Sequence, residues 1–234
     1  SKFYANTGAF GASNTKLFNN QSYLKTVLMF SGTENGFNND KLSNDYLKLN
    51  REFEEAYTQT KITLSSTYTK KLNAKNNIRT GFILNQLGYQ LLQKSLADTN
   101  VLITKINTKG NTHSVQGFFQ WNNQINQRLS TNVGLHYFQL LLNNSYAIEP
   151  RAALKFELNH RQNLTLGYGL HSQIQPIGVY FAETKNESNV NYTPNSNLPL
   201  SRAHHVVLGY DWNINDHEHI KTEFYYQHLF NVPI

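Results

Sequence analysis

The sequence predicts an all-β protein, an antiparallel up-and-down transmembrane β-barrel of which about nine or ten strands lie in this chain. Two observations predict it. Apolar and polar residues alternate along segment after segment, with the period of two expected of a strand that has one apolar face. The connections between these segments alternate between short polar turns and longer loops, which is typical of transmembrane barrels.

The bulk composition agrees with such a barrel. Of the 234 residues, 13% are aromatic and 39% are hydrophobic, and the mean hydropathy is -0.54. No run approaches the ~18 consecutive apolar residues of a membrane-spanning helix. Alternating barrel strands do not raise these averages, because half of their side chains face a polar lumen.

Charge and cysteine content exclude several classes of site. The formal net charge is +6, but the basic residues are scattered, so they are interpreted as solvated turn and lumen residues and not as a nucleic-acid surface. The chain has no cysteine. This excludes a disulfide framework, a thiol nucleophile and cysteine-based metal sites.

Residues 1–60 carry the weakest strand pattern. Residues 3–20 are interpreted as one incomplete strand followed by a turn, and 32–44 as a loop rich in asparagine. Between them, alternating apolar residues predict a strand over 23–31. In 40–57 the apolar spacing is helical, so this stretch is expected to be either a short helix or an irregular lead-in to the next strand.

The middle of the chain alternates clearly. Residues 61–72 and 78–88 predict two strands joined by a tight turn at 73–77, and 90–112 is expected to be a long loop. The strand predicted over 113–127 has one face made almost wholly of amides, as a water-filled lumen requires. A turn near Ser130 then leads into the next strand, which a medium loop at 143–149 follows.

The last third continues the pattern. Strands are predicted over 151–158 and 163–173, with a short turn at 159–162, and then a long loop over 174–202 that holds three of the five prolines. Two further strands flank a turn at 215–218. Pro150 and Pro233 are expected at strand ends, because a proline cannot donate to the ladder.

Aromatic residues support a membrane interface at the rim of short turns. Outward-facing aromatics next to those turns are expected in a barrel, because tryptophan and tyrosine settle at the headgroup level. The residues that meet both the parity and the position are Tyr68, Trp121, Phe156, Tyr210 and Trp212.

The parity opposite to the apolar one defines a predicted lumen wall. Its residues either hold one another in a hydrated ladder or contact a plug domain or a passing solute. Those expected to bind at the lumen and the extracellular mouth are His136, Arg151, Lys155, His171, Gln173 and His205.

Neither a metal site nor a catalytic residue is predicted. His217 and His219, with Asp216 and Glu218, have the composition of a metal site but are interpreted as a solvated turn. His171 beside Ser172 does not form a nucleophile elbow, since no Gly-x-Ser-x-Gly occurs. The glycines at 167 and 169 lack the further features of a dinucleotide site.

Four segments carry a resemblance to a known family. Residues 149–155 (EPRAALK), 167–176 (GYGLHSQIQP), 202–212 (RAHH and LGYDW) and 225–233 (YYQHLFNVP) resemble the barrel of TonB-dependent outer-membrane receptors of the Bacteroidetes type. The similarity extends over about residues 61–234 and is most specific from Glu149 onward.

The resemblance implies a barrel of about 22 strands closed by an N-terminal plug. Such a protein lies in the bacterial outer membrane and uses energy delivered by TonB to import a scarce nutrient: an iron complex, cobalamin or an oligosaccharide. The implied partners are the TonB complex, reached through the plug, the imported small-molecule or glycan ligand, a surface lipoprotein and the lipid bilayer. No enzyme activity, cofactor or nucleic-acid partner is expected.

The extent of the pattern predicts a fragment. Residues 1–234 are expected to form part of one transmembrane barrel domain, an internal piece without the plug domain and the C-terminal strands, because a sheet of this size would leave two unpaired edges in lipid. Two other functions stay open: a soluble all-β module that binds glycan or nucleic acid, and a barrel enzyme that acts on lipid through Ser172 and His171.

Overall fold

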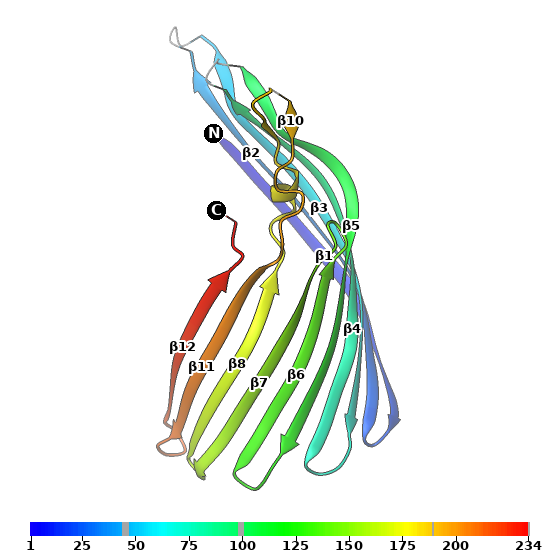
Figure 1. Cartoon of the computed structure of the whole chain (residues 1–234), viewed down its shortest axis with the longest axis vertical. Coiled ribbons are helices and arrows are strands. Elements are labelled where there is room, and N and C mark those ends of the chain that lie inside the picture. The colour runs from blue at the N-terminus through cyan, green and yellow to red at the C-terminus, as the bar shows by residue number, and fades with distance from the viewer. Residues whose placement is uncertain (44–46, 98–100, 189, 234) are drawn as a thin grey trace.

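Ten strands form one antiparallel sheet in which each strand pairs with the next strand of the meander (Figure 1). The computed structural model describes residues 1–43, 47–97, 101–188 and 190–233. The predicted all-β, up-and-down architecture and the strand number are confirmed. The strands of the sheet are β1 (Lys2–Asn19), β2 (Ser22–Leu42), β3 (Leu49–Lys71), β4 (Asn76–Leu96), β5 (Leu102–Gln124), β6 (Leu129–Leu140), β7 (Ser145–Asn159), β8 (Gln162–Gln173), β11 (Ser201–Asn213) and β12 (His219–Phe230).

Short turns gather at one rim of the sheet, and the long connection between β8 and β11 lies at the other end (Figure 1). Asparagines fix these turns, because a side-chain oxygen that accepts a nearby backbone N–H stabilises a tight turn. Asn73 accepts from the Lys75 N–H, and Asn126 accepts from the N–H groups of Arg128 and Leu129. The further turns of this rim repeat the arrangement with Asn19, Asn159 and Asn215.

The strands of the N-terminal half are much longer than those that follow. β5 has 23 residues and β6 has 12, whereas about 9–11 residues cross a bilayer as a tilted strand. The loops predicted over 32–44 and 90–112 were therefore mostly wrong. β2 extends to Leu42, and β4 and β5 extend to Leu96 and from Leu102, while residues 44 and 98–100 lie outside the described residues.

Two β-bulges explain why the sequence pattern failed in these extensions. The register of β2 and β3 shifts between Asn39, which pairs with Phe53, and Asp40, which pairs with Arg51. An extra residue in one strand reverses the parity on either side of it. The apolar residues of 40–57 therefore lack a clean period of two, and their spacing resembles that of a helix. The helix alternative was wrong, because β3 begins at Leu49; Tyr46 lies outside the described residues.

The same shift occurs between β4 and β5, where Gln93 pairs with Ile106 and Lys94 with Thr104. In addition, the outer side chains become polar between the apolar level and this bulge: Leu84 is followed by Gln86, and Val115 is preceded by His113. With polar residues on both faces, the alternation that marks a strand disappears.

A second correction concerns the connection between β6 and β7. Residues 145–149, expected to belong to a loop, are the first part of β7, and Pro150 lies inside that strand, paired with Leu135. The pairing of β7 with β8 begins only at Arg151. Proline is tolerated there because β7 has a neighbouring strand on only one side.

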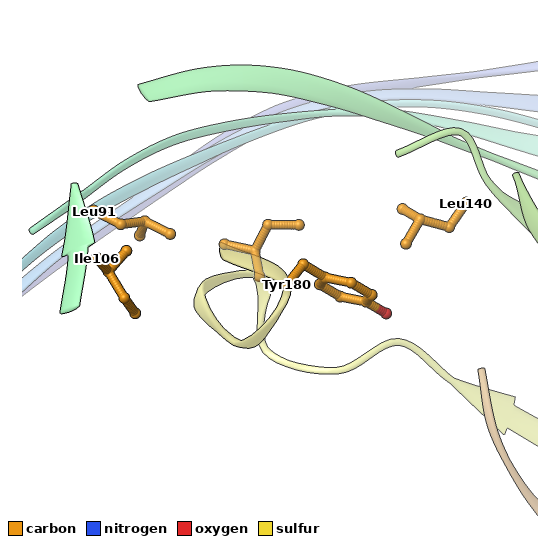
Figure 2. Packing of buried hydrophobic residues seen from close by; sticks show 5 residues of the cluster. Leu91, Ile106, Leu140 and Tyr180 are labelled. Carbon is orange, nitrogen blue, oxygen red and sulfur yellow. The ribbon is translucent and has the colours of Figure 1, made fainter. Parts of the chain in front are cut away.

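The long loop between β8 and β11 folds back onto one face of the sheet, called the inner face below. It contains the 3-10 helix η1 (Ile177–Phe181) and a small hairpin of β9 (Thr184–Lys185) and β10 (Asn191–Tyr192). Figure 2 shows η1 beneath the arching strands, with Tyr180 close to Leu140. These side chains form one buried cluster: Leu91, Ile106, Leu140, Ile177 and Tyr180.

Hydrogen bonds hold this loop in place. The Glu183 N–H donates to the Lys105 carbonyl, 2.9 Å away, and the Gln175 N–H donates to the Tyr180 hydroxyl. Burial raises the pKa of Tyr180, so its hydroxyl stays uncharged at neutral pH. The loop predicted at 174–202 is confirmed in position, although its packing against the sheet was not foreseen, and residue 189 lies outside the described residues.

The outer face of the sheet is an exposed apolar surface. Leu166 is 49% and Tyr168 is 39% exposed, so no second sheet covers them in the described part of the chain. The five aromatics expected at the rim of short turns share this face: the register aligns Tyr68 with Thr80, Trp121 with Ile78 and Trp212 with Ile220. Within the described residues, no helix is long and apolar enough to span a membrane.

Candidate functional site

Glu149 is the centre of a buried polar network on the inner face. Its side chain is 2% exposed. One carboxylate oxygen accepts from His136 Nδ1 at 2.9 Å and from the Arg151 guanidinium at 2.7 Å. The other accepts from the Ser172 N–H at 3.0 Å and from the Ser172 hydroxyl. Both oxygens of the carboxylate therefore accept hydrogen bonds, as a buried charge requires.

The strand register explains why these residues meet. His136 on β6 pairs directly with Glu149 on β7, and Arg151 lies two residues further along β7, on the same face. Ser172 comes from the end of β8. His136 is also held from the other side, since its Nε2 lies 3.1 Å from Oε1 of Gln116 on β5. Four neighbouring strands therefore contribute to one network.

Beside the network, one cross-strand row forms a hollow in the inner wall. The register joins Arg79 to Gln120, Gln120 to Gly134, Gly134 to Arg151, Arg151 to Gly169 and Gly169 to His205. From Gln120 to His205, glycine alternates with long side chains along this row. The hollow, called the inner-wall recess below, has a volume of about 580 Å³.

Small residues form the floor of the recess. Gly134, Ala153, Gly167 and Gly169 all line it. At Gly169 a Cβ would lie 2.6 Å from Nε2 of His171, so only glycine lets this imidazole lie over the strand. At Gly167 the nearest atom to a Cβ would be the Val207 carbonyl oxygen, 4.0 Å away, so the space above it is open.

Cation-forming side chains surround this floor. The guanidinium of Arg79 lies 5.8 Å from the centre of the Phe118 ring. The imidazoles of His171 and His205 meet edge to face, with their centres 4.8 Å apart. The Arg151 side chain is 45% exposed. The part of it that Glu149 does not bind remains available to the recess. The recess therefore offers several orientable donors around an open floor.

The structure brings together four of the six predicted binding residues. His136, Arg151, His171 and His205 all line the inner-wall recess. Lys155 lies instead in a second hollow beside the short turns, among amides such as Asn122 and Asn132. Gln173 lies in a third hollow at the other end, where the β8–β11 loop leaves the sheet.

Sequence reasoning missed the residue that organises the site. Glu149 was expected in a loop, because the strand signal before Pro150 is weak. The signal that could have found it is the spacing of Glu149 and Arg151, opposite charges two residues apart, which share a face if the segment is a strand. Arg79 also lines the recess, and the row that brings it near Arg151 follows only from the register of four strands.

The hydrogen bonding assigns structural roles to groups considered for chemistry. The Ser172 hydroxyl donates to Glu149, so its proton already has an acceptor. His219 Nε2 lies 3.4 Å from Asp211. Across the described ranges, no group of three or more His, Asp or Glu residues is placed to hold a metal ion.

Comparison with known proteins gives matches in structure only. No protein-family model matches the chain, and no curated protein does. The ferric-catecholate import receptor Fiu of E. coli K12 matches 97% of this chain with a TM-score of 0.72 at 10% sequence identity. The copper transporter OprC matches 94% (TM-score 0.65, 11% identity), and the RagAB peptide transporter matches 96% (TM-score 0.61, 10% identity).

The chain corresponds to only part of these proteins. It covers 41% of the Fiu chain, 38% of the OprC chain and 30% of the RagAB chain. The three are named as a receptor or as transporters, and none as an enzyme. The fold of this chain is therefore that of a section of the barrel of TonB-dependent outer-membrane receptors.

Proposed function

We propose that this chain is a section of the barrel of a TonB-dependent transporter that imports a scarce nutrient across a bacterial outer membrane. One observation supports the proposal: the two faces of the same sheet differ. The outer face is apolar and exposed, whereas the inner face is polar and has a hollowed wall. Lipid on one side and a plugged, hydrated lumen on the other account for both.

The two rims give the proposed orientation. Outer-membrane barrels have short periplasmic turns and longer extracellular loops. The rim of short turns would therefore face the periplasm, and the β8–β11 loop with the extensions of β2 to β5 would form the extracellular mouth. The loop narrows this mouth, because η1 packs against Leu91 and Ile106 on the inner face.

Partners and substrate follow from the same proposal. TonB would act through a plug domain elsewhere in the protein, and a surface lipoprotein would cover the mouth, as in the Bacteroidetes receptors that the sequence resembles. Siderophore-bound iron, copper and peptides, the cargoes in the names of the matched structures, are the first candidates for the cargo. Cobalamin and oligosaccharides are the others.

Uptake measurements test the proposal. The whole protein is expressed in a strain that lacks its own receptors, and uptake of copper, a ferric catecholate, peptides, cobalamin and an oligosaccharide is measured with and without an uncoupler. We expect uptake of one cargo that the uncoupler abolishes. A gene deletion in the native organism, tested with the same panel, is the matched control.

Electrophoresis tests the barrel itself. A folded barrel resists detergent, so the unheated protein is expected to migrate differently from the heated one. Identical migration, together with a monomer that stays in solution without detergent, would contradict the proposal and favour the soluble binding module.

A further inference from the structure

We infer that the inner-wall recess is a binding site for an anionic group, a carboxylate or a phosphate. The inference deepens the proposed function and rests on it, since the inner face must be open to water or to another part of the protein. Three features of the recess support it: its charge, the small residues of its floor and its volume.

The charge of the recess is one-sided. Two arginines and three histidines line it, Arg79, Arg151, His136, His171 and His205, and no aspartate or glutamate is among the described residues that do so. The nearest carboxylate partner, Glu149, is 2% exposed and accepts from both His136 and Arg151. With neutral histidines, two guanidinium charges face one carboxylate, which leaves a surplus of one positive charge.

Glu149 holds Arg151 in position but does not itself line the recess. Its contact at 2.7 Å involves one terminal nitrogen of Arg151, and a guanidinium has five N–H donors in a fixed fork. The remaining donors of Arg151, which lines the recess, are of the kind that binds carboxylate and phosphate in a bidentate manner. A fixed fork loses less freedom on binding than a mobile one.

The floor gives the anion room to approach. Gly134 and Gly169 stand on either side of Arg151 in the same cross-strand row, so these two positions add no side chain of their own beside the guanidinium, and the space over Gly169 is taken by the His171 imidazole. The volume of about 580 Å³ falls in the range of pockets that hold small ligands. A tricarboxylate fits such a volume.

The anion can come from two sources, a free solute in the lumen or an acidic side chain of the same protein that fills the lumen. Both present the same chemistry to the recess. The experiment therefore uses the whole protein in detergent and two probes, citrate and inorganic phosphate, with binding followed by titration calorimetry and unfolding followed by the thermal midpoint.

Two variants change the recess and one serves as control. Arg79→Gln removes one charge from a residue that takes no part in the Glu149 network. Gly167→Leu fills the open floor and leaves every charge in place. Lys109→Gln removes the same charge from an exposed residue of the outer face of β5. Equal heat-modified migration on a gel shows that each variant is folded.

For a free solute, citrate or phosphate binds the wild-type protein, both recess variants weaken binding by about tenfold or more, and Lys109→Gln changes it by less than about twofold. For an internal carboxylate, the probes do not bind the wild type, and Arg79→Gln lowers the thermal midpoint by several degrees more than Lys109→Gln does. Either result supports an anion site and identifies its source.

Any other result overturns the inference, including equal binding by all variants, or no binding together with equal midpoints for Arg79→Gln and Lys109→Gln. These outcomes leave the proposed function intact, because nutrient uptake and heat-modified migration are measured separately. If nutrient uptake and heat-modified migration are both absent while the anion site is intact, only the proposed transport function is rejected.

Discussion

At the scale of single residues, Glu149 determines how the inner wall is organised. A carboxylate that is 2% exposed has to be paired and hydrogen-bonded, because burying an isolated charge is very unfavourable. Four donors from His136, Arg151 and Ser172 meet that requirement. The same contacts hold the imidazole and the guanidinium in the positions where they border the recess.

Replacing Glu149 with glutamine should destabilise the protein. The amide keeps one acceptor oxygen, but its NH₂ group cannot accept from His136 or Arg151, so charge-assisted bonds are lost. We expect a loss of about 2 kcal/mol in the free energy of unfolding, at the lower end for buried pairs because Arg151 is 45% exposed. Denaturant unfolding in detergent, followed by tryptophan fluorescence, measures it.

Glu157→Gln is the matched control, on the same face of the same strand. Its side chain is 41% exposed, so water solvates either form, and a change within about 0.5 kcal/mol is expected. If both variants unfold at the same denaturant concentration, the Glu149 network has no special role in stability.

At the scale of elements, the short turns share one hydrogen-bonding arrangement. An asparagine side chain at the start of each accepts backbone N–H groups that no strand would satisfy. Because these contacts lie within a few residues of sequence, the sequence places the turns well. The turn predicted near Ser130 is displaced, since β6 already begins at Leu129, and so is the turn predicted within residues 3–20, since β1 extends to Asn19.

Asn126→Ala tests this arrangement. The substitution removes the acceptor of two backbone donors, those of Arg128 and Leu129, at a site where water replaces part of the loss. A decrease of about 1 kcal/mol in the free energy of unfolding is expected. Gln127→Ala, in the same exposed turn, should change it by less than half as much, and equal effects would show that the Asn126 contacts are dispensable.

The β8–β11 loop is held by hydrogen bonds and by the packing of a buried aromatic side chain. Tyr180 is 1% exposed and packs with Leu91, Ile106 and Leu140, which belong to three different strands. The loop carries little regular structure of its own, so this packing decides its position. Tyr57 of β3 borders the same cluster.

Tyr180→Ala should release η1 from the inner face. Removing a buried aromatic ring costs about 3 kcal/mol, which corresponds to roughly a hundredfold faster exchange through local opening. Hydrogen–deuterium exchange of residues 177–183 should accelerate accordingly, while β6 and β8 keep their protection. Tyr192→Ala, in the same loop but 47% exposed, is the control, and acceleration by both variants would contradict an anchor at Tyr180.

At the scale of the whole molecule, the sheet separates two environments. Apolar side chains face outward from most of its strands, whereas the inner face carries the polar network and the recess. β1 and β12 are the edges of the sheet, and an open edge is not tolerated in lipid. In a membrane the backbone groups of these two edges must therefore be paired.

Cysteine labelling tests the assignment of the two faces. The chain has no cysteine of its own, so each introduced thiol reports alone. In outer-membrane vesicles, a charged maleimide should label Thr165→Cys, on the inner face, at least about tenfold faster than Leu166→Cys, its neighbour on the outer face, because lipid excludes a charged reagent. Equal labelling, or faster labelling of Leu166→Cys, would reject a lipid-facing outer surface.

The features that could be predicted from the sequence are those that depend on residues close together in the chain. Alternation and turn residues predicted the strands over 23–31, 61–72, 78–88 and from about residue 113 onward, the inner or outer side of their residues, and the rim of short turns. They failed where β2 to β5 leave the apolar level, because bulges at Asp40 and near Lys94 shift the parity and both faces become polar. They failed again at residues 145–149, where Pro150 obscured the start of β7.

By itself, the sequence determined the all-β class, the two-faced strands and the tendency of His136, Arg151, His171 and His205 to share one side, because side-chain direction along a strand has a period of two. Only the tertiary structure decided which of them meet. Arg79 and His205 are far apart in the chain and share one recess only through the register of six strands. Register depends on pairings between distant residues, and these form only when the sheet does.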